Sequence, residues 1–229
     1  MKTLAIIPAG GVGRRMGGGV PKQYLPLAGI PVLARTLRPF QDSPDIDEIY
    51  LAVPEGDIPE VRQRIVEPYG LSKVGLILAG GRERQDSVRN ALDQLRVEQE
   101  IIVVHDAVRP FVTAALIEQS VAAARKYGAV SLGVPVKDTV KEVNPAGWVE
   151  KTLDRQRLWL TQTPQAFHRS ILLAAYEKAA RDGISATDDA GLVEAMGTAV
   201  RMIPGAEANI KLTTAEDMVL GEVILGRRT

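Results

Sequence analysis

Short apolar runs alternate with longer amphipathic segments over the first 135 residues. Most of the runs hold few charges, which is typical of strands covered on both faces of a sheet. Between them, apolar residues recur at helical spacing. The pattern predicts strands over 3–8, Glu48–Val53, Val74–Ala79, Ile101–His105 and Ala129–Pro135, and helices over 31–41, 57–67, 84–96 and 113–127. This order predicts an α/β fold, a Rossmann-like and mostly parallel sheet with helices on both faces.

After Pro135 the alternation ends. Residues 138–157 predict a β-hairpin, with strands Thr139–Val143 and Trp148–Leu153 around a turn at 144–147. A lone hairpin is marginally stable in water and needs a surface to lie on. That surface is either a second subunit, which makes the hairpin a homodimer arm, or the hairpin's own domain.

The tail returns to helical spacing. It predicts helices over 169–182, 187–196 and 214–225 and a strand near 199–203. Thr213-Thr214-Ala215-Glu216 fits a capping box that opens the last helix. We expect 1–229 to form a single domain, with 138–157 as a protruding β-arm.

Composition removes several classes of function. The chain of 229 residues has 28 basic and 28 acidic side chains and no cysteine. Zero net charge argues against a protein that coats nucleic acid, and the lack of cysteine excludes a thiolate nucleophile or a disulfide framework. No run approaches the roughly 18 apolar residues of a membrane span, and the first run is shorter than the roughly 7–15 residues of a signal peptide. We expect a cytoplasmic protein with neither nucleic acid nor membrane as a partner.

A glycine-rich stretch from Pro8 to Lys22 directly follows the first predicted strand, at the edge where open α/β sheets bind ligands. Six glycines in eleven residues cost backbone entropy, but they let N–H groups approach a phosphate. A Walker loop is excluded because no Gly-Lys-Ser/Thr follows. A dinucleotide fingerprint puts Met16 where a small residue is needed. We favour a nucleoside triphosphate loop, in which Arg15 and Lys22 neutralise the phosphates and a pyrophosphate leaving group.

Two further residues suit phosphate chemistry. Asp106 follows a predicted strand directly, and a carboxylate there suits Mg²⁺, although it could also cap a turn. Arg109 has the planar fork that binds phosphate with two hydrogen bonds. The two histidines, His105 and His168, are expected to be structural.

The loop and its continuation Pro-Lys-Gln-Tyr-Leu resemble the signature of sugar-phosphate nucleotidyltransferases, and in particular the 2-C-methyl-D-erythritol 4-phosphate cytidylyltransferases of isoprenoid biosynthesis. Further matching blocks follow along the chain. They are Gly80-Gly81 with Arg84-Gln85-Asp86-Ser87-Val88, then 104–110, 134–139, 158–165, 187–190 and Asn209-Ile210-Lys211.

The resemblance implies transfer of a cytidylyl group from CTP to 2-C-methyl-D-erythritol 4-phosphate, with release of pyrophosphate. The attacking phosphate is already an anion, so positioning and charge stabilisation are enough. One alternative keeps this chemistry with a pentitol phosphate such as ribitol 5-phosphate as acceptor. Another is a non-catalytic or dehydrogenase-like nucleotide-binding module, which would have no use for Arg15 and Lys22.

The resemblance also assigns roles to single residues. Arg15 and Lys22 would be catalytic, and Asp106 would bind Mg²⁺. The nucleotide would be bound by Ala9, Gly10, Gly11, Gly13, Gly81, Ser87 and Ala107. The acceptor would be positioned by Arg109, Thr139, Arg155, Thr163, Thr187 and Lys211, with Thr139 and Arg155 coming from the neighbouring subunit of a homodimer. Arg15, Lys22, Arg109, Arg155 and Lys211 would then converge on one rim.

Overall fold

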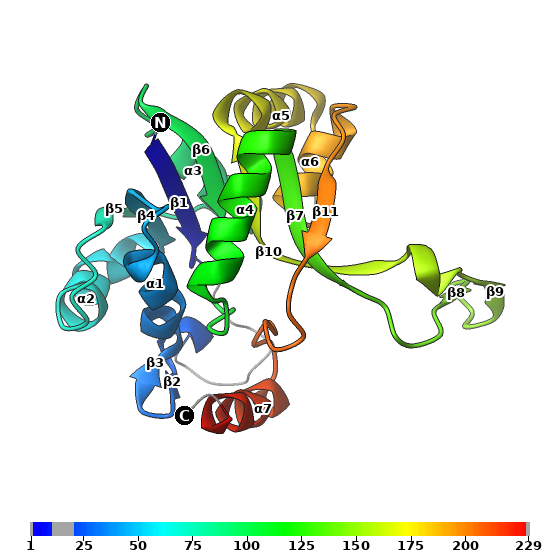
Figure 1. The fold of residues 1–229 in the computed structure, drawn as a ribbon, viewed down its shortest axis with the longest axis horizontal. Helices are drawn as coiled ribbons and strands as arrows, with labels where there is room; N and C mark the ends of the chain where they lie inside the picture. Colours follow the sequence, from blue (N-terminus) through cyan, green and yellow to red (C-terminus); the bar gives the residue numbers. More distant parts are fainter. Residues whose placement is uncertain (1, 11–20, 228–229) are drawn as a thin grey trace.

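The computed structural model describes residues 2–10 and 21–227. A seven-stranded sheet forms the centre of the molecule (Figure 1). Across the sheet the strands are β11 (Arg201–Pro204), β7 (Ala129–Pro135), β10 (Trp159–His168), β6 (Gln99–Val104), β1 (Lys2–Pro8), β4 (Glu48–Val53) and β5 (Val74–Ala79). Only β10 is antiparallel to its two neighbours. The prediction of a mostly parallel α/β sheet is confirmed, and three of its strands, β4, β5 and β7, both begin and end at the predicted residues.

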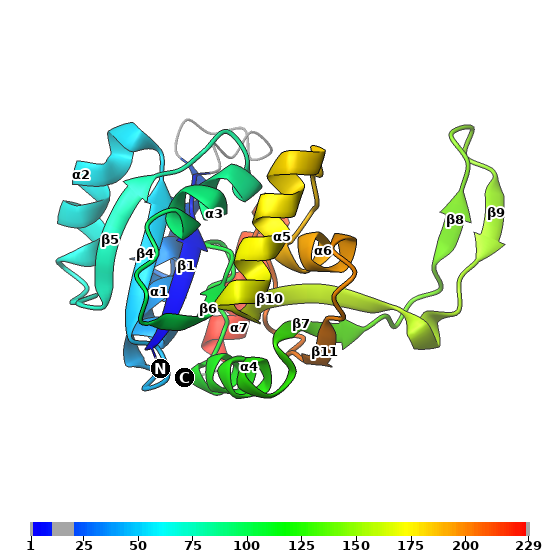
Figure 2. The same cartoon turned by 90° about the horizontal axis from the view of Figure 1, so that it is seen from above.

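Helices cover both faces of the sheet. Successive strand residues point to opposite sides, so each face presents apolar side chains that a helix layer buries. In β1, Leu4 and Ile6 pack into one layer, and Ala5 and Ile7 into the other. The first layer holds α3 (Arg84–Leu92), α5 (Arg169–Asp182) and α6 (Asp189–Ala195); the second holds α1 (Val32–Asp42), α2 (Ile58–Val61), the π-helical turn η3 (Arg62–Val66) and α4 (Ala114–Tyr127) (Figure 2). Burial of each large aliphatic side chain here contributes about 1.5–3 kcal/mol.

A small third cluster anchors the chain's last helix. Helix α7 (Ala215–Gly226) packs through Gly221 against Phe111 and Leu27, beside the short ribbon β2 (Pro26–Leu27) and β3 (Ile30–Pro31). Its capping box uses Thr214 and Asp217, one residue later than predicted, and α6 is capped by Asp188. Among the described residues no helix has the length and apolar character needed to cross a membrane.

The pattern missed β10, a ten-residue strand in the middle of the sheet. Its buried part contains Gln162, Thr163, Pro164 and Gln165, which disguise it as a polar loop. Their polar groups are hydrogen-bonded to neighbouring segments, and the pairing with β7 shifts register between Gln162 and Gln165. The segment predicted as one helix over 57–67 consists of α2 and the π-helical turn η3, and the 3-10 turn η2 (Glu55–Asp57) precedes them. Pro59 lies in the first turn of α2, where a proline is tolerated.

The hairpin arm stands away from the sheet (Figures 1 and 2). Its strands β8 (Lys141–Val143) and β9 (Val149–Thr152) are shorter than predicted. At the tip, the side-chain oxygen of Asn144 accepts hydrogen bonds from the backbone N–H groups of Ala146 and Trp148. Trp148 remains 74% exposed, so the arm leaves apolar surface in water that its own domain does not cover.

Candidate active site

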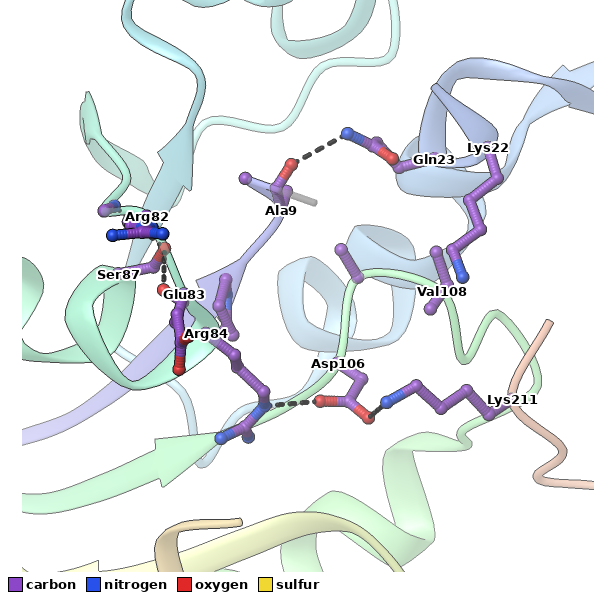
Figure 3. Close-up of a pocket in the computed structure, with 14 residues that line it drawn as sticks. Ala9, Lys22, Gln23, Arg82, Glu83, Arg84, Ser87, Asp106, Val108 and Lys211 are labelled. Atoms are coloured by element: carbon purple, nitrogen blue, oxygen red, sulfur yellow. Dashed lines mark hydrogen bonds and ion pairs between the residues drawn. The ribbon is translucent and has the colours of Figure 1, made fainter. Parts of the chain in front are cut away.

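A pocket of about 190 Å³ lies where the strand ends of β1 and β6 meet the loop between β5 and α3 (Figure 3). The turn η1 (Lys22–Tyr24) and the segment before α7 complete its walls. Its lining includes the predicted residues Ala9, Gly10, Lys22, Gly81, Ser87, Asp106, Ala107 and Lys211. The structure therefore brings together eight of the predicted site residues, five of which were expected to bind the nucleotide.

Lys22 is carried to this pocket by its neighbour Gln23. The Gln23 side chain is buried, and its Nε2 donates a 2.8 Å hydrogen bond to the Ala9 carbonyl at the end of β1. This bond ties η1 to the sheet, so the Lys22 side chain lines the pocket (Figure 3). The predicted Gly11, Gly13 and Arg15 lie outside the described residues.

The loop between β5 and α3 packs closely against the first turn of its helix. A Cβ on Gly81 would lie 2.1 Å from the Asp86 Cβ, so only glycine fits there. The Ser87 hydroxyl accepts a bond from Gly81 N–H and donates one to the Glu83 carbonyl. Ser87 thus fixes the shape of the loop that forms this wall.

Asp106 is nearly buried and surrounded by cations. Arg84 Nε lies 2.9 Å from its Oδ1, while Lys211 Nζ lies 2.8 Å and Arg109 Nε 3.6 Å from its Oδ2. Burial alone would raise the pKa of Asp106, but the three cations hold that pKa well below its usual range. The carboxylate is therefore ionised, and both of its oxygens have partners.

A second pocket of about 170 Å³ adjoins the first. Arg84, Asp106 and Lys211 line both pockets. The predicted residues Arg109, Thr163 and Thr187 line the second one, together with Thr161, Gln162, Gln165 and Asp188. Two ligands in these pockets would meet at the shared wall.

Arg109 clamps three segments together. Its Nη1 donates to the Asn209 carbonyl at 2.9 Å, and its Nη2 donates to the Thr161 carbonyl at 3.4 Å. Burial lowers the pKa of Arg109, although the Asp106 charge opposes that shift. Most of its fork is directed at backbone, so its predicted phosphate contact stays a prediction.

The buried His105 is hydrogen-bonded to Arg109 and Thr163, in agreement with the structural role expected for it. Complete burial lowers its pKa to about 4, so the ring is neutral near pH 7. Its Nε2 faces the Arg109 carbonyl at 3.1 Å and must donate, so Nδ1 accepts from the Thr163 hydroxyl at 2.9 Å. The same hydroxyl accepts from Asp106 N–H, and in this way Thr163 fixes the backbone that carries Asp106.

Thr139 and Arg155 are not brought to either pocket within one chain. Both are exposed at the base of the arm, and Arg155 Nη1 donates to the Lys137 carbonyl at 2.8 Å. The rim of five basic residues is therefore incomplete in a single subunit, since Arg155 is not part of it.

The donors present suit a metal ion that arrives with phosphate. No group of three or more carboxylate or histidine side chains within 2–10 and 21–227 could hold an ion alone. Asp106 is the one carboxylate shared by the two pockets, and it already neutralises three cations. Mg²⁺ commonly binds through one carboxylate together with substrate phosphates and waters. Asp106 fits the role of that single carboxylate ligand.

The sequence does not reveal the role of Arg84, which stands there only within one of the matching blocks. Its guanidinium joins Asp106 to Asp189, which is fully buried and also accepts a bond from Tyr176. Burial would lower the pKa of Arg84, but the Asp189 and Asp106 carboxylates raise it above its usual value. The sequence offers only a weak signal, namely an acidic residue directly after an apolar strand and another in the first turn of a predicted helix; their burial, which makes a cationic partner necessary, is visible only in the structure.

A mostly parallel sheet with a cationic double pocket at its strand ends is typical of α/β enzymes that bind nucleotides and phosphates. The family model "IspD: 2-C-methyl-D-erythritol 4-phosphate cytidylyltransferase" matches residues 3–227. The chain belongs to this family of cytidylyltransferases.

Individual relatives agree with the family model. The chain is 52% identical over 224 residues to the 2-C-methyl-D-erythritol 4-phosphate cytidylyltransferase of Syntrophus aciditrophicus, covering 98% of this chain and 96% of the relative. The crystal structure of 4-diphosphocytidyl-2C-methyl-D-erythritol synthase from Anaerococcus prevotii is similar with a TM-score of 0.86 and 33% identity, over 99% of this chain and 97% of that one. The crystal structure of the Thermus thermophilus cytidylyltransferase gives a TM-score of 0.80 and 32% identity, over 99% and 100% of the chains.

Proposed function

We propose that this chain transfers a cytidylyl group from CTP to 2-C-methyl-D-erythritol 4-phosphate. An oxygen of the acceptor phosphate attacks the α-phosphorus of CTP, and the bond from that phosphorus to the bridging oxygen of the β-phosphate breaks. The products are 4-diphosphocytidyl-2-C-methyl-D-erythritol and pyrophosphate. The observation that carries the proposal, beside family membership, is the pair of pockets that share Arg84, Asp106 and Lys211.

The proposed roles follow from charge. Lys22, with Arg15, neutralises the triphosphate and the departing pyrophosphate. Lys211, whose side chain is 40% exposed, binds the acceptor phosphate at the shared wall. A magnesium ion, when bound, would screen the triphosphate charge and would be held mainly by phosphate oxygens, with Asp106 as its protein ligand.

The arm supports a homodimer in which each subunit completes its partner's site. Val143, Trp148 and Val149 are more than half exposed, which is unfavourable unless another surface covers them. Thr139 and Arg155 at the base of the arm would then reach the acceptor phosphate of the partner. The homodimer and a cytoplasmic location remain predictions.

Release of pyrophosphate tests the activity directly. Purified protein is assayed with CTP and Mg²⁺ and with either 2-C-methyl-D-erythritol 4-phosphate or ribitol 5-phosphate. We expect the methylerythritol phosphate to have the higher kcat/KM. A higher value for ribitol 5-phosphate would favour the pentitol alternative, and no release with either would contradict the proposed transfer.

A further inference from the structure

A chain of polar side chains runs from the buried helical layer to the wall that the two pockets share. The Tyr176 hydroxyl donates to Asp189 Oδ1 at 2.6 Å, and Arg84 Nη2 lies 2.7 Å from Asp189 Oδ2. On its other side Arg84 contacts Asp106, which contacts Lys211. These residues come from α5, α6, α3, the end of β6 and the segment before α7. The chain thus ties the helical layer to the strand ends that carry the site.

Stability alone is a poor reason for this arrangement. Moving charges out of water costs several kcal/mol per ion, and a buried pair roughly offsets that cost at best. Asp189 is fully buried and Asp106 nearly so. A hydrophobic contact between α3 and α6 would serve packing equally well, so the charges call for a second explanation.

The geometry at Asp106 provides one. Arg84 occupies Oδ1, and Lys211 approaches Oδ2, so the carboxylate cannot turn both oxygens toward Lys211 (Figure 3). Arg84 is itself held in place by Asp189, and both Arg84 and Lys211 line both pockets. Lys211 is therefore held by a single carboxylate oxygen at the wall where two ligands would meet.

We infer that Arg84 is a positioning residue, which acts through Asp106 to keep the Lys211 ammonium directed at the acceptor phosphate. This inference rests on the proposed function. Without Arg84, Asp106 turns toward Lys211 with both oxygens and competes with the phosphate for it. Binding of the acceptor weakens, while binding of CTP weakens less, because in the proposed function Lys22 and Arg15 neutralise most of the triphosphate charge.

The test compares R84M/D189N with D189N. Arg84→Met alone would leave Asp189 as an isolated buried charge and destabilise the fold. Removing both charges restores a melting temperature near that of D189N but leaves Asp106 without its orienting partner. We expect the acceptor KM to rise about 30-fold or more, as loss of a charge-assisted contact does. The CTP dissociation constant, measured by calorimetry without acceptor, should change less than about threefold.

Two more variants complete the design. R84K/D189N keeps a cation beside Asp106 and should recover at least half of the lost acceptor affinity on a logarithmic scale. Arg181→Met carries the same change at an exposed residue of α5 that pairs with Asp182, and it should match the wild type.

Three outcomes would overturn the inference. They are an unchanged acceptor KM in R84M/D189N, an equal loss of CTP and acceptor binding, and failure of R84K/D189N to differ from R84M/D189N when both melt cooperatively. If R84M/D189N does not fold, R84Q/D189N, which also lacks the cation, takes its place in the comparison, and an acceptor KM in that variant equal to that of D189N would overturn the inference as well. No turnover by the wild type would instead contradict the proposed function, and the acceptor affinities measured by calorimetry would still test the role of Arg84.

Discussion

The double pocket and the arm are built in opposite ways. At the pocket, Asp106 has three cationic partners, and the residues behind it are buried and hydrogen-bonded. On the arm, the side-chain contacts join exposed groups, such as Lys141 with Thr152 and Arg155 with the Lys137 carbonyl. The pocket is held in shape by its own chain, whereas the arm leaves its apolar side chains in water.

This difference separates what one subunit does alone from what it needs a partner for. Charged groups fixed before the substrate arrives cost no reorganisation during the reaction. An exposed two-stranded ribbon has no such rigidity until a second surface covers it. We therefore expect changes in the pocket to act on chemistry and stability, and changes in the arm to act on assembly and acceptor binding.

Lys22→Met should have the largest effect. Loss of one preorganised cation at a phosphoryl centre costs about 10²–10³-fold in turnover, while CTP binding should weaken less than tenfold. Pyrophosphate release gives kcat, and calorimetry gives the CTP dissociation constant. Lys2→Met, at an exposed surface ion pair with Glu98, is the control. Wild-type turnover by Lys22→Met would mean that the cation we place at the phosphates has another role.

Gln165→Leu tests whether the buried hydrogen bonds beside the pocket contribute strongly to the free energy of unfolding. Its Oε1 accepts from the N–H groups of Asp189 and Ala190, and its Nε2 donates to Ser131 and Asp188. Leaving these buried groups without partners should cost about 3 kcal/mol. Urea unfolding measures the loss.

The matched change on the arm is Trp148→Ser. It should leave the unfolding free energy of the subunit within about 0.5 kcal/mol, because the side chain is exposed, and should instead weaken the dimer. Sedimentation at several concentrations measures that second effect. Equal losses of subunit stability in the two variants would contradict the division we draw.

The same division explains what could be predicted from the sequence. Apolar strands such as Glu48–Val53 were predicted residue for residue, because burial on both faces leaves a clear run. Strand β10 was not, because its interior uses Gln162, Thr163 and Gln165 to bond to other segments, and those partners are visible only in three dimensions.

For the site, the glycine-rich loop and the strand ends predicted the location, since ligands bind at that edge of the sheet. They did not predict which arginine N–H donors are already hydrogen-bonded to other groups of the protein. Arg109 is used largely on backbone carbonyls, and Arg84 joins residues 22 and 105 positions away. Spacing in sequence carries no information on such long-range pairs.

Arg155→Met probes the arm as a component of the partner's site. Loss of one charge-assisted phosphate contact should raise the acceptor KM about 10-fold or more, with unchanged CTP affinity and unchanged subunit stability. Lys151→Met, also exposed on the arm, is the control.

Mixing subunits decides in which chain Arg155 acts. When Arg155→Met and Lys22→Met subunits are mixed at random, half of the dimers are mixed, and in each of these one site has both changes and the other has neither. About a quarter of the wild-type activity at low acceptor concentration should therefore return. No recovery after verified exchange of subunits would show that each arm serves its own chain.

Asp217→Asn should have the smallest effect, and it tests whether the segment carrying Lys211 is stabilised like the rest of the pocket. Asp217 Oδ2 accepts bonds from the Thr213 backbone and hydroxyl and from Thr214 N–H, directly after that segment. Burial would raise the pKa of Asp217, but these donors lower it. Because the folded pKa is below the unfolded value of about 3.9, the ionised group stabilises the fold above that pH and loses its contribution as the pH falls through the folded pKa. Thermal melts from pH 3 to 7 should show the wild type about 1 kcal/mol more stable than Asp217→Asn at neutral pH, with the gap closing below about pH 4. A gap that stays constant over the whole range would mean that shape, and not charge, stabilises the start of α7.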